Sequence, residues 1–112
     1  MNEILKKLRI DEINLGACIG GDKWLENADS NYIESFNPTN GELLAKVKLC
    51  SENDYEKVIT ESNRIFQDWR MVPAPVRGQL ILEMANELRD KKDLLGSLVS
   101  LEMGKIKAEG DG

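Results

Sequence analysis

Apolar residues in the C-terminal third of the chain recur at three- and four-residue steps, which predicts helix from Pro73 to Lys105. The two apolar blocks are Leu80, Ile81, Met84, Ala85 and Leu88, then Leu94, Leu95, Leu98, Val99 and Leu101. Pro75 suits a first helical turn, Gly104 suits a left-handed stop, and Gly96 is expected to weaken or bend the middle. One face of this helix, or helix pair, is therefore expected to be buried.

The segment from Ser51 to Met71 is predicted to form a second amphipathic helix. Ser51 can cap its start, and Glu52 and Asp54 lie at the positive end of its dipole. One face comprises Tyr55, Val58, Ile59, Ser62, Phe66 and Trp69. Pro73 restricts the residue before it, so the helix is expected to end near Met71.

The middle of the chain has the pattern of a β-hairpin. Residues 32–36 predict a strand that stops at Asn37-Pro38, because proline cannot donate to a strand ladder. Residues 43–49 predict its partner, with Leu43, Ala45, Val47 and Leu49 on the side expected to be buried. Asn40-Gly41 favours a tight turn between them, because both positions tolerate positive φ.

The N-terminal quarter is predicted to hold a short helix and a second hairpin. Residues 1–15 are interpreted as an N-terminal arm that forms one short amphipathic helix, with Ile4, Leu5 and Leu8 on one face. The Gly-Gly-Asp sequence at 20–22 predicts a tight turn between flanking residues that can pair. Residues 27–31 are polar and are expected to form a connecting turn before the next strand.

Composition favours a single acidic domain without a nucleic-acid surface. A chain of 112 residues is long enough for one hydrophobic core. Its formal net charge of -5 and pI of about 4.8, without a basic run, argue against binding to nucleic acid. Lys6, Lys7 and Arg9 interrupt the apolar residues of 1–12, so these residues lack the continuous apolar core of a signal peptide or membrane span. A soluble, cytoplasmic protein without a membrane partner is expected.

Histidine is absent from the sequence, which limits the chemistry of the chain. Without imidazole, the usual hydrolase triads and histidine-containing zinc sites cannot be built from this chain alone. Cys18 and Cys50 lack the spacing of a redox or metal motif and are interpreted as reduced thiols, not as nucleophiles. No glycine-rich loop leads from a strand into a helix, so no dinucleotide site is complete here. Trp24 and Trp69 are expected to pack in a core or an interface.

Several short motifs resemble the N-terminal region of NAD-dependent aldehyde dehydrogenases. They are Val72-Pro73-Ala74-Pro75, Arg77-Gly78, the turn from Asn37 to Glu42, and the run from Leu95 to Lys105. Leu-Glu-Met-Gly-Lys at 101–105 is specific to this family, and the longer run from Gly96 resembles its antiquitin branch. At position 40 the chain has Asn where the family's Asn-Pro-x-Thr-Gly-Glu turn has Thr. This difference also resembles the antiquitin branch. The likeness extends back to about Asn14.

The resemblance implies an α/β fold, with this chain as the N-terminal part of a Rossmann-like cofactor domain built from two β-hairpins and two long helical segments. Residues 16–112 would then be an incomplete part of the NAD-binding domain. The complete enzyme would oxidise an aldehyde, such as α-aminoadipic semialdehyde, by thiolate attack, hydride transfer to NAD and hydrolysis of the thioester. The catalytic cysteine, the glutamate base and the cofactor loop would all lie outside these residues, so this segment alone would bind no NAD. Its partner would be the remainder of the fold, and the full-length enzyme is expected to be a homotetramer.

Glu102 is the most informative carboxylate, because it lies near the end of an apolar helix, where the helix dipole disfavours an anion. By resemblance to the family, Glu102 and Ser35 would contribute to a monovalent-cation site that includes backbone carbonyls. The alternative is a surface glutamate, paired for instance with Lys105. Arg77 matches a family arginine, and the resemblance implies a structural role for it.

A different class of function also fits the sequence. The chain could be a non-enzymatic binding or assembly module, or a catalytically inactive truncated remnant. A reading frame that continues past Gly112 into a βαβ unit would support the enzyme, and a stop codon at that point would support the alternative.

Overall fold

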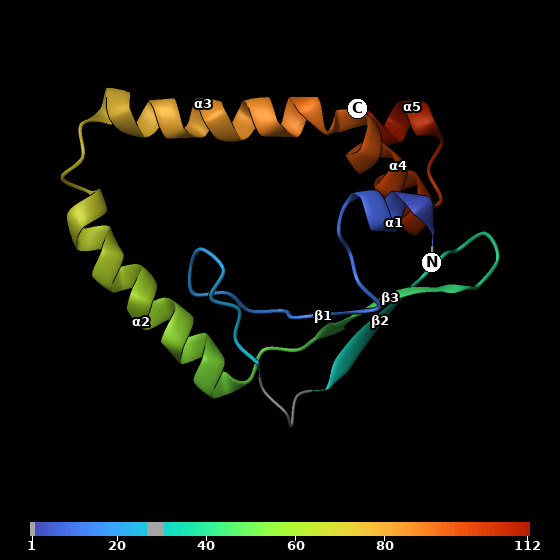
Figure 1. Ribbon diagram of the computed structural model, residues 1–112, viewed down its shortest axis with the longest axis horizontal. Helices are drawn as coiled ribbons and strands as arrows, with labels where there is room; N and C mark the ends of the chain where they lie inside the picture. The colour runs from blue at the N-terminus through green and yellow to red at the C-terminus, as the bar shows by residue number, and fades with distance from the viewer. Residues whose placement is uncertain (1, 27–30) are drawn as a thin grey trace.

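A computed structural model of the protein describes residues 2–26 and 31–112 (Figure 1). Residues 27–30 of the predicted connecting turn lie outside this described part. The elements are α1 (Glu3–Lys7), β1 (Ile13–Asn14), β2 (Tyr32–Phe36), β3 (Leu43–Lys48), α2 (Glu52–Trp69), α3 (Ala74–Asp90), α4 (Lys92–Met103) and α5 (Lys107–Gly110). The mixed α/β architecture predicted from the sequence is confirmed.

The strands form a small sheet in the order β1-β3-β2. β2 and β3 are the predicted antiparallel hairpin, and the register places Glu34 opposite Lys46. Their side chains form an ion pair with an N–O distance of 2.6 Å. β1 pairs with β3 in parallel, which the sequence pattern did not predict, because residues 1–15 were expected to form one helix. The helix in that stretch is shorter and ends at Lys7.

A turn is present at both predicted places, but the one between β2 and β3 spans Asn37 to Glu42, and of its Asn40-Gly41 pair only Gly41 has a positive φ. Between β2 and β3, the N–H of Asn37 donates to the carbonyl of Glu42 at 2.9 Å, and Gly41 has a φ of 74°. This left-handed backbone is the conformation for which glycine is favoured. At the N-terminal hairpin, Cys18 and Trp24 form an antiparallel bridge around Gly20 and Gly21.

The long helices follow the expected end signals. Ser51 caps α2, because its Oγ accepts a hydrogen bond from the N–H of Asp54 at 3.0 Å. The predicted helical region from 73 to 105 divides at Lys91, whose φ of -102° and ψ of 7° leave the helical range. Gly96 therefore lies inside α4 and does not mark the break. Gly104 ends α4 in the left-handed conformation, as predicted.

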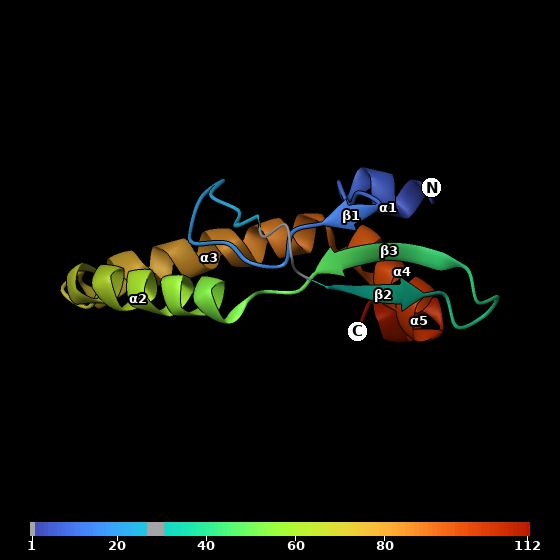
Figure 2. The same ribbon diagram turned by 90° about the horizontal axis from the view of Figure 1, so that it is seen from below.

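The molecule is flat and extended. Its principal-axis extents are 49 × 38 × 18 Å, and its radius of gyration is 17.1 Å. A compact domain of this length would have a radius of gyration of about 13 Å. Figures 1 and 2 show that α2 and α3 extend away from a group formed by the sheet, α1, α4 and α5.

This shape leaves few side chains buried. Leu5 of α1 is 3% exposed and Ala45 of β3 is 9% exposed. The expectation of a buried face in the first apolar block is wrong for this chain: Leu80, Ile81, Met84 and Leu88 are 45–61% exposed. The reason is that α3 extends away from the sheet. Trp24, Leu43 and Val47 are likewise exposed instead of buried.

Candidate functional site

Ser35 and Glu102, the two predicted cation ligands, lie in contact. The Oγ of Ser35 donates a hydrogen bond to Oε1 of Glu102 at 2.7 Å. The residues are 67 positions apart, and they come from β2 and from the last turn of α4. Ser35 is half-buried and Glu102 is exposed. The fold therefore brings together two side chains that sequence spacing alone would not connect.

Two features of the backbone position this pair. Ser35 pairs with Ala45 and Phe36 pairs with Leu43, so Leu44 is an extra residue on β3. Such a bulge redirects neighbouring side chains and bends the strand. At the other end, a Cβ on Gly104 would lie 3.1 Å from Cγ of Pro38. The β2–β3 turn therefore lies against the end of α4, where Glu102 is located.

The electrostatic setting of Glu102 favours a positive or hydrogen-donating neighbour. The negative end of the α4 dipole disfavours an anion at this position, and the hydroxyl of Ser35 provides partial compensation. Carboxylate and hydroxyl oxygens suit hard cations. Within residues 2–26 and 31–112, however, no group of three or more His, Cys, Asp and Glu side chains is placed to hold a metal ion. Among the described residues, the side-chain partner of Glu102 is Ser35, not Lys105.

Arg77 lies near the start of α3, where the sequence places it. It is half-buried, and its Nε is buried without a hydrogen-bond partner among the described residues. A buried N–H group without a partner costs about 1–3 kcal/mol. A hydrogen-bond acceptor from polypeptide outside these residues would therefore stabilise the fold by pairing with Nε of Arg77.

Both cysteines make contacts with the nearby backbone. The half-buried Sγ of Cys18 accepts from the N–H of Gly20 at 3.4 Å, within the N-terminal hairpin. Cys50 is exposed, and its thiol donates to the adjacent carbonyl of Ser51 at 3.3 Å. These are local contacts with the backbone, and they do not supply the neighbouring base that activates a catalytic thiol.

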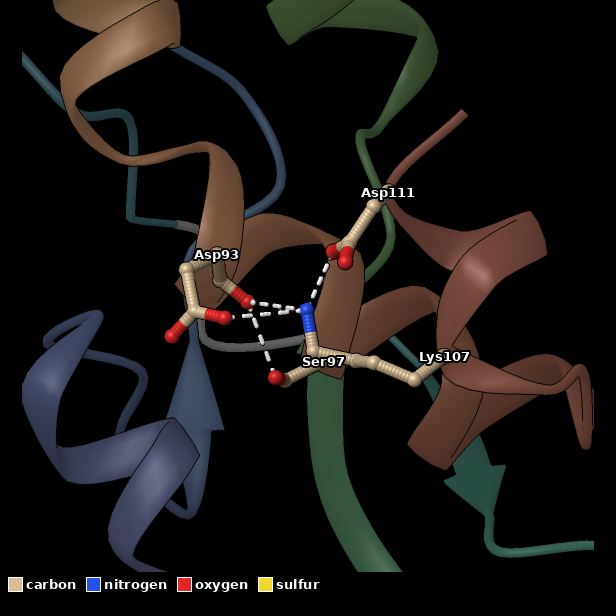
Figure 3. Close-up of polar contacts among 4 residues, drawn as sticks. All are labelled: Asp93, Ser97, Lys107 and Asp111. Atoms are coloured by element: carbon tan, nitrogen blue, oxygen red, sulfur yellow. Dashed lines mark hydrogen bonds and ion pairs between the residues drawn. The ribbon is translucent and has the colours of Figure 1, made fainter.

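A second polar cluster, which the sequence analysis did not identify, joins α4 to α5 (Figure 3). Nζ of Lys107 donates to the carbonyl of Asp93 at 3.1 Å and pairs with its carboxylate at 3.1 Å. Lys107 also pairs with Asp111, and Ser97 donates to the same Asp93 carbonyl at 2.8 Å. The i,i+4 spacing of Lys107 and Asp111 is a sequence pattern from which their ion pair could have been predicted. Their contact with Asp93 depends on the fold and could not.

Among the described residues, no glycine-rich loop leads from a strand into a helix. β3 connects to α2 through Leu49, Cys50 and Ser51, so no glycine lies where a phosphate would approach a helix N-terminus. Gly20 and Gly21 belong to the N-terminal hairpin instead. None of the helices in residues 2–26 and 31–112 has the length and apolar character needed to cross a membrane.

Comparison with known proteins gives one consistent family. The sequence profile described as "Aldehyde dehydrogenase family" matches residues 24–112. The chain is 43% identical over 108 residues to an aldehyde dehydrogenase family 7 member A1 homolog of Caenorhabditis elegans, covering 96% of this chain and 20% of that protein. It is 44% identical over 108 residues to the alpha-aminoadipic semialdehyde dehydrogenase of Rattus norvegicus, covering 96% of this chain and 19% of the relative. The chain thus spans about a fifth of the length of the curated relatives that it matches.

Proposed function

The chain belongs to the aldehyde dehydrogenase family, and we propose that it is the N-terminal part of an NAD-dependent enzyme that oxidises an aldehyde to a carboxylic acid. The observation that carries the proposal is the family match over residues 24–112. Because several relatives are named alpha-aminoadipic semialdehyde dehydrogenase, that semialdehyde is the proposed substrate.

In this proposal, residues 1–112 have a structural role and the chemistry lies elsewhere. Residues 1–15 form an N-terminal arm, and residues 16–112 begin the NAD-binding domain. The catalytic cysteine, the glutamate base and the NAD-binding loop belong to the remaining four fifths of the enzyme. No residue of this chain is assigned to catalysis or to binding of NAD.

Physical features of the chain support its assignment as part of a larger fold. The apolar face of α3 is exposed, and Nε of Arg77 is buried without a partner among the described residues. Both arrangements are unfavourable unless further polypeptide supplies apolar surface and a hydrogen-bond acceptor. The proposed partner is therefore the remainder of the aldehyde dehydrogenase fold.

Ser35 and Glu102 are proposed to contribute to a monovalent-cation site. The support is their direct contact and the need to compensate a carboxylate at the negative end of α4. The site would be structural, with backbone carbonyls as further ligands.

Assembly and location complete the proposal. A homotetramer in the cytoplasm is the arrangement proposed for the full-length enzyme. The two free cysteines suit a reducing compartment. Mass measurement of the purified full-length protein in solution tests the oligomeric state.

The central experiment compares the 112-residue chain with the complete reading frame that contains it. We expect the complete protein to reduce NAD in the presence of aldehyde, with α-aminoadipic semialdehyde preferred over simple aldehydes. The 112-residue chain alone should give no reduction above the blank. A stop codon at Gly112 would support the inactive remnant or assembly module instead. Activity of the short chain that disappears in Cys18→Ser or Cys50→Ser would overturn the assignment of roles.

A further inference from the structure

The β2–β3 turn contains a dipeptide with its own chemistry. Asn40-Gly41 is the one asparagine-glycine step in the sequence, and both residues are exposed. The backbone nitrogen of a glycine is sterically accessible, because glycine carries no Cβ. A Cβ on Gly41 would meet no atom within 4 Å, so the space around this amide is open.

The side chain of Asn40 is hydrogen-bonded within the turn. Its Oδ1 accepts a hydrogen bond from the N–H of Glu42 at 3.0 Å. This contact closes an Asx-turn, in which the asparagine side chain bonds to the backbone two residues further along the chain. The N–H of Gly41 donates to the carbonyl of Asn37 at 2.8 Å. That single hydrogen bond must open before the nitrogen of Gly41 can approach Cγ of Asn40.

We propose that Asn40 is a site of spontaneous deamidation and isomerisation. The backbone nitrogen of Gly41 attacks Cγ of Asn40 and loses its proton. The new C–N bond closes a succinimide ring, and the bond from Cγ to the side-chain nitrogen breaks and releases ammonia. Water then opens the ring at either carbonyl. One product is aspartate, and the other is isoaspartate, in which the main chain runs through the former side chain. No electrons are transferred, and water is the only co-reactant.

The modification changes a turn that the fold uses. Either product adds a carboxylate two positions before Glu42, and isoaspartate also lengthens the main chain by one carbon. The hydrogen bond from Gly41 to Asn37 closes this turn, and the turn lies against the end of α4 through Pro38 and Gly104. Isoaspartate at position 40 should therefore loosen the hairpin, and aspartate should affect it less.

Peptide mapping of the purified 112-residue chain tests this proposal. After incubation in mildly alkaline buffer, the peptide containing Asn40 should acquire the mass of the acid and become a substrate for an isoaspartyl methyltransferase. Asn37 is the control in the same turn, because Pro38 has no N–H to attack. Asn86, which precedes Glu87, is the control in a helix.

Two variants extend the test. Asn40→Thr should abolish methyl acceptance and the mass change in the peptide that contains position 40, which is separate from any isoaspartate formed at Asp111-Gly112. In the complete reading frame that contains this chain, Asn40→Asp should keep the hairpin amides as protected from hydrogen exchange as in the fresh protein, whereas aged protein loses part of this protection. An Asn40 peptide that changes no faster than the Asn86 peptide would overturn the proposal, and so would undiminished methyl acceptance of the corresponding peptide in Asn40→Thr. These outcomes do not depend on whether the chain is part of an active enzyme.

Discussion

Gly110 of α5 packs directly on Gly96 of α4. A Cβ on Gly110 would lie 2.3 Å from the carbonyl oxygen of Gly96, and a Cβ on Gly96 would lie 3.0 Å from the carbonyl carbon of Gly110. Neither position has room for a side chain unless the backbone moves. The closeness of α4 and α5 therefore depends on both glycines, and Lys107 reinforces it from one side (Figure 3).

Gly110→Ala should destabilise the protein because the new methyl group meets a backbone atom. Overpacking of this kind costs about 1–3 kcal/mol. Thermal unfolding of the complete enzyme, followed by circular dichroism, should show a lower midpoint. Gly78→Ala is the matched control, because a Cβ on Gly78 meets no atom within 4 Å. Alanine is favoured over glycine in a helix interior by about 0.5–1 kcal/mol, so this variant should be slightly more stable. Equal losses in both variants would show that the contact between the glycines is not the cause.

The elements were predictable where local chemistry determines them. Asn37-Pro38 and Asn40-Gly41 lie between β2 and β3, because proline and glycine determine the backbone angles at their own positions. Ser51 starts α2, because its hydroxyl caps the first turn of the helix. β1 was not predictable, because a strand of two residues has no readable alternation. The pattern of residues 73–105 allows a helix pair, but it does not predict the position of the break at Lys91, because the apolar spacing resumes after it.

The candidate site was predictable only through resemblance. Periodicity indicates that Glu102 is poorly placed at a helix end, but it does not indicate that Ser35 lies beside it. The exposure of α3 could not be read from its pattern either, because an amphipathic stripe has the same spacing whether or not its partner belongs to the same chain.

Glu102→Ala should reduce the thermal stability of the complete enzyme more in potassium or sodium buffer than in a buffer with a large organic cation. The reason is that only small cations could be coordinated by the carboxylate and the Ser35 hydroxyl. The hydrogen bond itself contributes on the order of 1 kcal/mol, and it is lost in every buffer. Glu83→Ala, which removes an exposed carboxylate from α3, should show no dependence on the cation. An equal loss of thermal stability for Glu102→Ala in all buffers would show that Glu102 is an ordinary surface glutamate and not a cation ligand.

Lys107 predicts a pH dependence in the alkaline range. The hydrogen bond with Asp111, followed by that with Asp93, raises the pKa of Lys107 above its ordinary value of 10.5. Because the pKa is higher in the folded state, the stabilisation is fully present below pH 10.5 and is lost as the pH rises through the folded pKa. The difference in unfolding midpoint between the natural protein and Lys107→Gln should therefore shrink in that range. Lys107→Arg should hold its stability to higher pH, because guanidinium stays protonated. A constant difference between the natural protein and Lys107→Gln across the range would contradict this account.

The exposed apolar surface predicts how the isolated 112-residue chain behaves. Ile81 and Leu88 of α3 are 59% and 61% exposed, and Phe66 of α2 is 51% exposed. Large exposed apolar side chains of this kind favour association. The chain should be helical by circular dichroism, yet self-associate and bind a hydrophobic dye, with poorly protected hairpin amides.

Substitution on α3 separates this cause from general instability. Ile81→Glu combined with Leu88→Glu should lower both dye binding and association without loss of helical signal, because neither side chain is buried in this chain. Gln79→Glu adds a charge to an exposed position of the same helix and should leave dye binding unchanged.

In the complete enzyme, where further polypeptide is proposed to cover this face, the double substitution should instead reduce stability. Burying unpaired carboxylates there would cost several kcal/mol. A monomeric 112-residue chain with a sharp cooperative melt, no dye binding and well-protected hairpin amides would show that these residues are a self-sufficient domain, which would favour the assembly module over the enzyme.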